Sequence, residues 1–194
     1  MSMASKFFKL IGRIDRRNEN VAEGAFGIPV AKFDVSKVTD TVKISVQNDI
    51  MQLDDIDGDH FDQVYDAALR SISAGRDLSL LYQALLQMNI NGMTKERAAE
   101  IARLLNNKAT ALMQKEQLES LGIRSAVWLY SGAPCVINPK TARDWEKQQD
   151  AAHRAANGKQ YDVSKGMFLN GKWTWPGIEP GCRCVSKAVV SGFS

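Results

Sequence analysis

Cysteine and histidine are scarce in this sequence, which holds three cysteines and two histidines in 194 residues. A small, odd number of cysteines provides no disulfide framework, so reduced thiols or a metal site are the roles that remain for them. No apolar run is long enough to cross a bilayer, and the sequence has no signal-peptide core. We therefore expect a soluble protein, made in the cytoplasm, with no membrane-spanning segment.

Signatures of the common enzyme classes are also missing. The sequence contains no glycine-rich phosphate loop, no G-x-S-x-G elbow and no pair of zincin histidines. It has neither the H-x-E nor the P-C-x-x-C element that a zinc deaminase requires. From these absences we expect a protein that is not an enzyme.

Apolar and charged residues are present in ordinary globular amounts, at 44% and 24%, and the net charge is +3. The charge is unevenly distributed, because residues 124–194 carry ten lysines and arginines against five acidic residues. A basic surplus of this size permits contact with phosphate groups. Double-stranded DNA is therefore one partner to consider for the C-terminal part of the chain.

The N-terminal arm, residues 1–58, contains two patterned segments. Residues 6–17 predict a short amphipathic helix with basic residues on one face. The opposite face carries four apolar side chains, which are Phe7, Leu10, Ile11 and Ile14. A short surface helix that covers the chain's own core is the commoner role of such a pattern. The apolar face is also a candidate partner-binding surface, and with so few apolar residues a protein is a better partner than lipid. Further along, the alternation in Val38–Val46 predicts a strand.

Residues 59–122 predict a helical region of about three helices, of which the third is long. Asp59 is expected to cap the first helix, Asp77 the second and Thr94 the third. The third helix should extend to a glycine cap at Gly122. Short loops between such helices are typical of a bundle.

Residues 123–194 predict a compact module that contains all four tryptophans. Ser125–Tyr130 and Cys182–Val190 predict strands, and Pro139–Ala156 predicts a partly helical segment. Glycines and prolines mark the turns between them. A helical region followed by a small mixed α/β module with few strands belongs to the α+β class.

Four residues of this module have the chemistry of zinc ligands. Cys182 and Cys184, two apart on a predicted strand, would point the same way, and Cys135 with His153 would complete a tetrahedral set. Structural zinc sites more often use paired C-x2-C knuckles, however, and this C-x-C pair stands alone. We therefore favour buried small side chains and no cofactor, with a zinc-stabilised binding module as an alternative.

His153 is the only histidine of the module, so it is the one candidate of its kind for a general base. Arg143 and Arg183 belong to the same module and could neutralise a phosphate group. These residues outline a nuclease-like enzyme as a further alternative, although a hydrogen-bonded structural histidine is the commoner role.

Several segments between residues 60 and 194 carry a resemblance to a known family. They are RAAEIAR (Arg97–Arg103), NNKATA (Asn106–Ala111), LGIRSAVWLYSG (Leu121–Gly132), His153 with GKQYDVSKG (Gly158–Gly166), and WPGIEPGCRCVSKAVVSGF (Trp175–Phe193). Taken in order, they resemble the phage Mu F-like minor head proteins, also called phage head morphogenesis proteins. The chain departs from the usual family pattern at Leu104-Leu105 and in the loop Ala133–Ala152.

The resemblance implies a virion protein present in few copies at the portal vertex, with a part in head morphogenesis, DNA packaging or DNA delivery. Its implied partners are the portal protein, the major capsid protein and packaged double-stranded DNA. Such a protein would be assembled in the host cytoplasm and located in the head of the virion.

Overall fold

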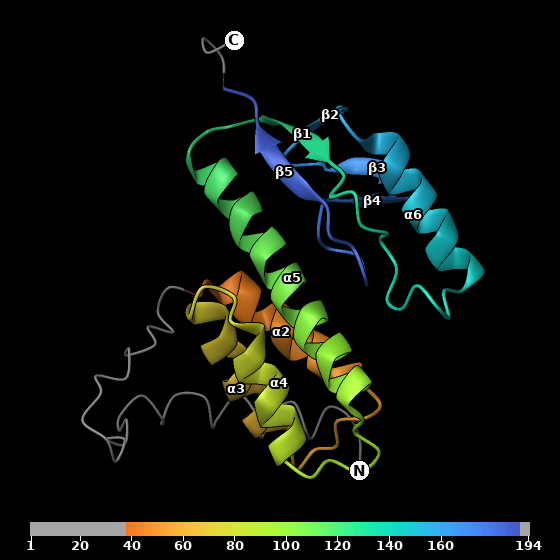
Figure 1. Ribbon diagram of the computed structural model, residues 1–194. Coiled ribbons are helices and arrows are strands. Elements are labelled where there is room, and N and C mark those ends of the chain that lie inside the picture. The colour runs from red at the N-terminus through yellow and green to blue at the C-terminus, as the bar shows by residue number, and fades with distance from the viewer. Residues whose placement is uncertain (1–37, 191–194) are drawn as a thin grey trace. The chain divides into compact units, whose positions relative to one another are not determined.

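The computed structural model describes residues 38–190, in which most helices come first and the strands follow (Figure 1). The helices are α2 (Asp40–Met51), α3 (Phe61–Ser73), α4 (Leu78–Gln87), α5 (Lys95–Ser120) and α6 (Asp144–Ala156). The strands are β1 (Ser125–Leu129), β2 (Gln160–Asp162), β3 (Met167–Leu169), β4 (Lys172–Thr174) and β5 (Val185–Ala188). We call α2–α5 the helical region and residues 123–190 the C-terminal module. Their order confirms the α+β class.

The prediction of a strand at Val38–Val46 is wrong. Most of this segment belongs to helix α2 instead. Thr39 caps this helix, because its side-chain oxygen accepts a hydrogen bond from the backbone N–H of Val42. Val42, Val46 and Ile50 are all buried. Apolar residues four apart share one face in a helix and also in a strand, so their spacing alone does not decide between the two. Burial of this face against α3 and α5 favours the helix.

The starts of the other helices follow the predicted caps in two cases out of three. Asp77 and Thr94 accept hydrogen bonds from the first turns of α4 and α5, as expected. Asp59 does not cap α3. The side chain of Asp57 accepts instead from the backbone N–H groups of Asp59 and His60, at 3.0 Å each. The His60 ring is part-buried between Asp57 and the carbonyl of Met88.

The core of the helical region consists of aliphatic side chains from all four helices. Besides Ser71 of α3, one further polar residue of this region is fully buried, Asn106 of α5. Its amide donates to the carbonyl of Ala102 at 2.9 Å and its oxygen accepts from the Ser71 hydroxyl at 3.1 Å. Both ends of the amide are therefore satisfied, which removes most of the free-energy cost of burying it.

Helix α5 ends as the sequence predicts and leads the chain into the C-terminal module. Gly122 has a φ of +70°, and the N–H of Ile123 donates to the carbonyl of Leu118 at 2.9 Å. This pair of features is the Schellman cap, which needs a glycine because side chains disfavour that backbone conformation. Helix α5 contacts the other helices of the helical region and also β5, so it joins the two regions.

The C-terminal module contains a three-stranded antiparallel sheet in the order β2-β1-β5 and a separate hairpin, β3-β4. The hairpin turns at Asn170-Gly171, where both residues have positive φ, as a two-residue hairpin turn requires. The predicted strand Ser125–Tyr130 is confirmed as β1. The predicted strand Cys182–Val190 is confirmed only from Val185 to Ala188, so the cysteines precede it.

Two hydrogen bonds tie α5 to the C-terminal module. The amide of Asn107 donates to the carbonyl of Cys182 at 3.1 Å, and that of Gln114 donates to the carbonyl of Ser186 at 2.9 Å. The apolar helical face at residues 7–14, predicted to bind a partner, lies outside the described residues. Among the helices of residues 38–190, none combines the length and apolar character needed to span a bilayer.

Candidate metal centre

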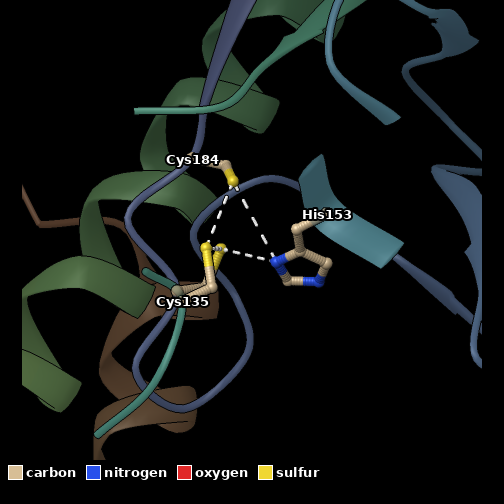
Figure 2. A group of neighbouring side chains, drawn as sticks. Cys135, His153 and Cys184 are labelled. Carbon is tan, nitrogen blue, oxygen red and sulfur yellow. Dashed lines mark hydrogen bonds between the residues drawn. The ribbon is translucent and has the colours of Figure 1, made fainter. Parts of the chain in front are cut away.

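Four side chains meet in the middle of the C-terminal module: Cys135, His153, Cys182 and Cys184. Their three sulfurs and one ring nitrogen all lie within 4.8 Å of one another, and all four residues are buried. Figure 2 shows the Nδ1 atom of His153 directed at the sulfur atoms. The four residues come from the loop after β1, the last turn of α6 and the loop before β5. This cluster could bind a metal ion.

The distances within the cluster match the edges of a coordination tetrahedron. With metal–sulfur bonds of about 2.3 Å and a metal–nitrogen bond of about 2.0 Å, the edges are roughly 3.8 Å and 3.5 Å. The Cys135 sulfur lies 3.5 Å from that of Cys184 and 3.9 Å from that of Cys182. The His153 Nδ1 atom lies 3.4 Å and 4.0 Å from the sulfurs of Cys182 and Cys184. Little movement is needed to place an ion at the centre.

The loop that carries Cys182 and Cys184 is held in place by its backbone. The N–H of Cys182 donates to the carbonyl of Glu179 at 2.9 Å, and the N–H of Gly177 donates to the Cys182 sulfur at 3.3 Å. Gly181 has a φ of +73°, and a Cβ at that position would lie 2.5 Å from the backbone of Val136. Only glycine lets this loop come so close to the segment that carries Cys135.

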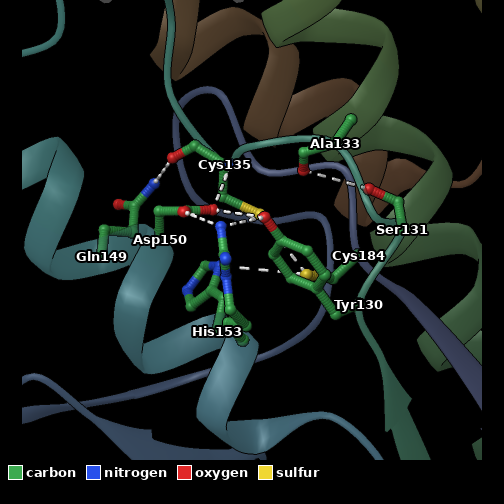
Figure 3. Close-up of polar contacts among 9 residues, drawn as sticks. Tyr130, Ser131, Ala133, Cys135, Gln149, Asp150, His153 and Cys184 are labelled. Carbon is green, nitrogen blue, oxygen red and sulfur yellow. Dashed lines mark hydrogen bonds and ion pairs between the residues drawn. The ribbon is translucent and has the colours of Figure 1, made fainter. Parts of the chain in front are cut away.

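Cys135 is positioned by two neighbouring residues of α6 (Figure 3). Its N–H donates to Asp150 at 2.7 Å, and its carbonyl accepts from the Gln149 amide at 3.1 Å. Asp150 also accepts from the Tyr130 hydroxyl at 2.7 Å and pairs with Arg154 at 3.0 Å. Burial works to raise the pKa of Asp150, but these hydrogen bonds lower it below its ordinary value. The carboxylate is therefore a charged anchor for the cysteine backbone.

Trp128 of β1 holds the imidazole of His153. The two rings meet edge to face, with their centroids 5.0 Å apart, and both residues are fully buried. The buried indole N–H of Trp128 has no hydrogen-bond partner among the described residues.

The three thiols cannot all ionise at such short distances unless a cation compensates their charge. Hydrogen bonds with Cys182 and Cys184 lower the pKa of Cys135 below its ordinary value. The hydrogen bond with Cys135 raises the pKa of Cys182, and it raises that of Cys184 to about 12. A divalent cation at the centre would remove this conflict, because it favours the thiolate form of every ligand.

The structure does not bring the remaining catalytic candidates to His153. The ring of His153 is 1% exposed and faces sulfur, which leaves no room for a substrate at Nδ1. Arg143 pairs with Glu146 and stacks on the Trp145 ring, and Arg183 is an exposed residue. The nuclease-like arrangement of these residues stays a prediction.

Comparison of the chain with protein-family models, curated proteins and solved structures finds no match in any of the three.

Proposed function

We propose that Cys135, His153, Cys182 and Cys184 bind one structural zinc ion, and that the protein acts by binding partners during phage head assembly. The observation that carries the zinc assignment is the convergence of four buried ligand atoms within 4.8 Å. Three sulfurs and one imidazole nitrogen favour zinc over magnesium or calcium, which prefer oxygen ligands.

A structural role fits these ligands better than a catalytic one. Four protein ligands fill the tetrahedral shell of zinc, whereas catalytic zinc sites keep one position for water or substrate. The ligands are also buried, so substrate has no approach to the ion. Bound zinc would join the loop after β1, helix α6 and the loop before β5, which are distant in the sequence. The ion would replace the large apolar core that this module lacks.

The assembly role rests on the resemblance to phage Mu F-like minor head proteins, and the placement of its motifs supports it. LGIRSAVWLYSG spans the end of α5 and β1, while GKQYDVSKG contains β2 and the turn after it. WPGIEPGCRCVSKAVVSGF contains both cysteines of the C-x-C pair and β5. These three segments surround the candidate metal centre, whereas RAAEIAR and NNKATA belong to α5.

In this proposal the protein is a minor head protein, present in few copies near the portal vertex of a tailed phage. Its partners are the portal protein or the major capsid protein, and the basic surplus of the C-terminal part permits contact with packaged DNA. No catalytic step is assigned to it.

Deletion of the protein from the phage tests the assembly role. We expect particles without it to be defective in infectivity or DNA packaging, and we expect the intact protein to co-purify with the portal protein. A Cys184→Ser variant should give the same defect, because it removes one ligand. Normal particle yield and infectivity after deletion would contradict the assembly role and leave the metal site unaffected.

A further inference from the structure

A cleft lies between the first half of α5 and the loop 136–139. It has a volume of about 430 Å³, and its walls include Lys95 and Arg103 of α5, Ile137 of the loop, and Arg183. A narrower pocket shares Arg103, Ile137 and Arg183 and continues the cleft along α5. The cleft is separate from the metal centre, which is buried.

Three cations of this cleft have no ionic partner in the part of the chain that the structure describes. Lys95, Arg103 and Arg183 are all exposed, and none of them forms an ion pair within residues 38–190. The wall also contains two acidic residues, Glu96 and Glu100. The Glu100 carboxylate forms an ion pair with Arg97 at 3.4 Å. The cleft therefore offers an excess of positive charge to a ligand.

The walls are also apolar in part, which bears on the chemistry of the ligand. Ile137, Pro139 and the ring of Tyr82 line the cleft beside the cations. Tyrosine and arginine are enriched at the centres of protein–protein interfaces. A nucleic acid backbone carries closely spaced negative charges but no apolar side chains that could pack against Ile137 and Pro139. A protein segment can combine acidic and apolar side chains in the order that the cleft requires.

We propose that this cleft binds an acidic segment of a partner protein, whose carboxylates pair with Arg103 and Arg183 while its apolar side chains pack against Ile137 and Pro139. The inference rests on the proposed assembly role, for which it names a docking surface.

The position of Arg183 connects the cleft to the metal centre. Arg183 lies between Cys182 and Cys184, whose side chains are buried in the cluster, whereas its own side chain lines the cleft. Fixing the two cysteines therefore fixes the backbone from which the arginine extends. A fixed backbone at this position keeps Arg183 at the wall of the cleft before a ligand binds.

The test is a binding titration on the full-length, zinc-loaded chain. The probe is a short fluorescent peptide in which glutamates are interspersed with leucine and phenylalanine, and fluorescence anisotropy reports binding. Arg103→Ala and Arg183→Ala should each weaken binding about tenfold, since each removes a charge-assisted hydrogen bond. Arg70→Ala is the matched control, because Arg70 is an exposed arginine of α3 outside the cleft, and it should bind like the unaltered chain.

Two further probes separate the possible ligands. A peptide with lysine in place of every glutamate should not bind. A short DNA duplex should not displace the acidic peptide. The proposal is wrong if the acidic peptide fails to bind, if both cleft variants bind it like the control, or if DNA binds and the cleft variants abolish that binding. None of these measurements involves the virion, so they remain informative if the assembly role itself fails.

Discussion

The helical region and the C-terminal module are stabilised in different ways. The helical region buries aliphatic side chains from four helices against one another, and its buried Ser71 and Asn106 side chains are hydrogen-bonded to each other. The core of the C-terminal module is built around three cysteines, a histidine and Trp128, with strands of only three to five residues. A module with so small an apolar core generally needs a metal ion or disulfides for stability. The helical region thus depends on hydrophobic burial, whereas the C-terminal module packs around the candidate metal cluster.

This difference has a convenient spectroscopic reporter. All four tryptophans lie in the C-terminal module, whereas most helical residues belong to the helical region. Tryptophan fluorescence therefore follows the module, and far-ultraviolet circular dichroism follows mainly the helices. Together, these two signals distinguish unfolding of the C-terminal module from unfolding of the helical region.

The largest effect is expected from Cys182→Ala. Structural zinc in small domains contributes on the order of 10 kcal/mol of apparent binding free energy, and three ligands hold it much less tightly than four. We expect tryptophan fluorescence to shift to that of solvent-exposed indole, while most of the helical circular dichroism remains. A chelator added to the unaltered chain should give the same result. Unchanged fluorescence in both experiments would mean that the module does not depend on a metal.

A core substitution in the helical region should have the reverse pattern. Leu81 of α4 is fully buried, and Leu81→Ala should lower the free energy of unfolding of the helical region by about 3 kcal/mol. In a urea titration, the circular dichroism transition should shift more than the fluorescence transition. Equal shifts of both transitions would show that the two regions unfold as one cooperative unit.

Asp150→Ala tests how far the surroundings of the ligands matter. It removes the acceptor of the Cys135 N–H and the partner of Tyr130, so metal affinity should fall about tenfold to a hundredfold. Competition with a zinc-binding dye measures this change. Asp144→Ala is the matched control, since Asp144 is an exposed carboxylate on the same helix that pairs with Lys147. Equal affinity in the two variants would contradict the positioning role of Asp150.

The smallest effect is expected from Glu146→Gln. Glu146 is 2% exposed and accepts hydrogen bonds from the backbone N–H groups of Ile137 and Arg143, both at 2.9 Å. A glutamine can accept only one of them, so the variant should lose about 1–2 kcal/mol of stability at neutral pH.

This loss should depend on pH in a defined direction. Burial works to raise the pKa of Glu146, but its hydrogen bonds lower it below the ordinary 4.5. The stabilisation is therefore complete above the unfolded pKa and disappears as the pH falls through the lower, folded pKa. Urea titrations of both proteins should show a constant difference near neutral pH that shrinks below about pH 4.5. A difference that grew on acidification would contradict this role.

The sequence allowed much of the helical region to be predicted, because periodicity and caps are local signals. Asp77, Thr94 and the glycine cap at Gly122 were predicted correctly from neighbouring residues alone. Val38–Val46 was predicted wrongly, since its apolar spacing fits both periods and only its burial against α3 and α5 decides between them.

The candidate site could be predicted only as a set of residue types. Cys135 and His153 belong to different segments, and their meeting with the C-x-C pair depends on the antiparallel pairing of β1 with β5 and on the tight backbone at Gly181. The positioning roles of Trp128 and Asp150 had no signal in the sequence, because they depend on side-chain orientation. The strands β2, β3 and β4 were missed because three residues are too few to show alternation.

The metal content of the purified chain tests the central claim most directly. Elemental analysis of protein prepared in metal-replete medium should give one equivalent of zinc per chain, and the Cys182→Ala chain prepared in parallel should give much less. Less than about half an equivalent of zinc in the unaltered protein would contradict a structural site at Cys135, His153, Cys182 and Cys184.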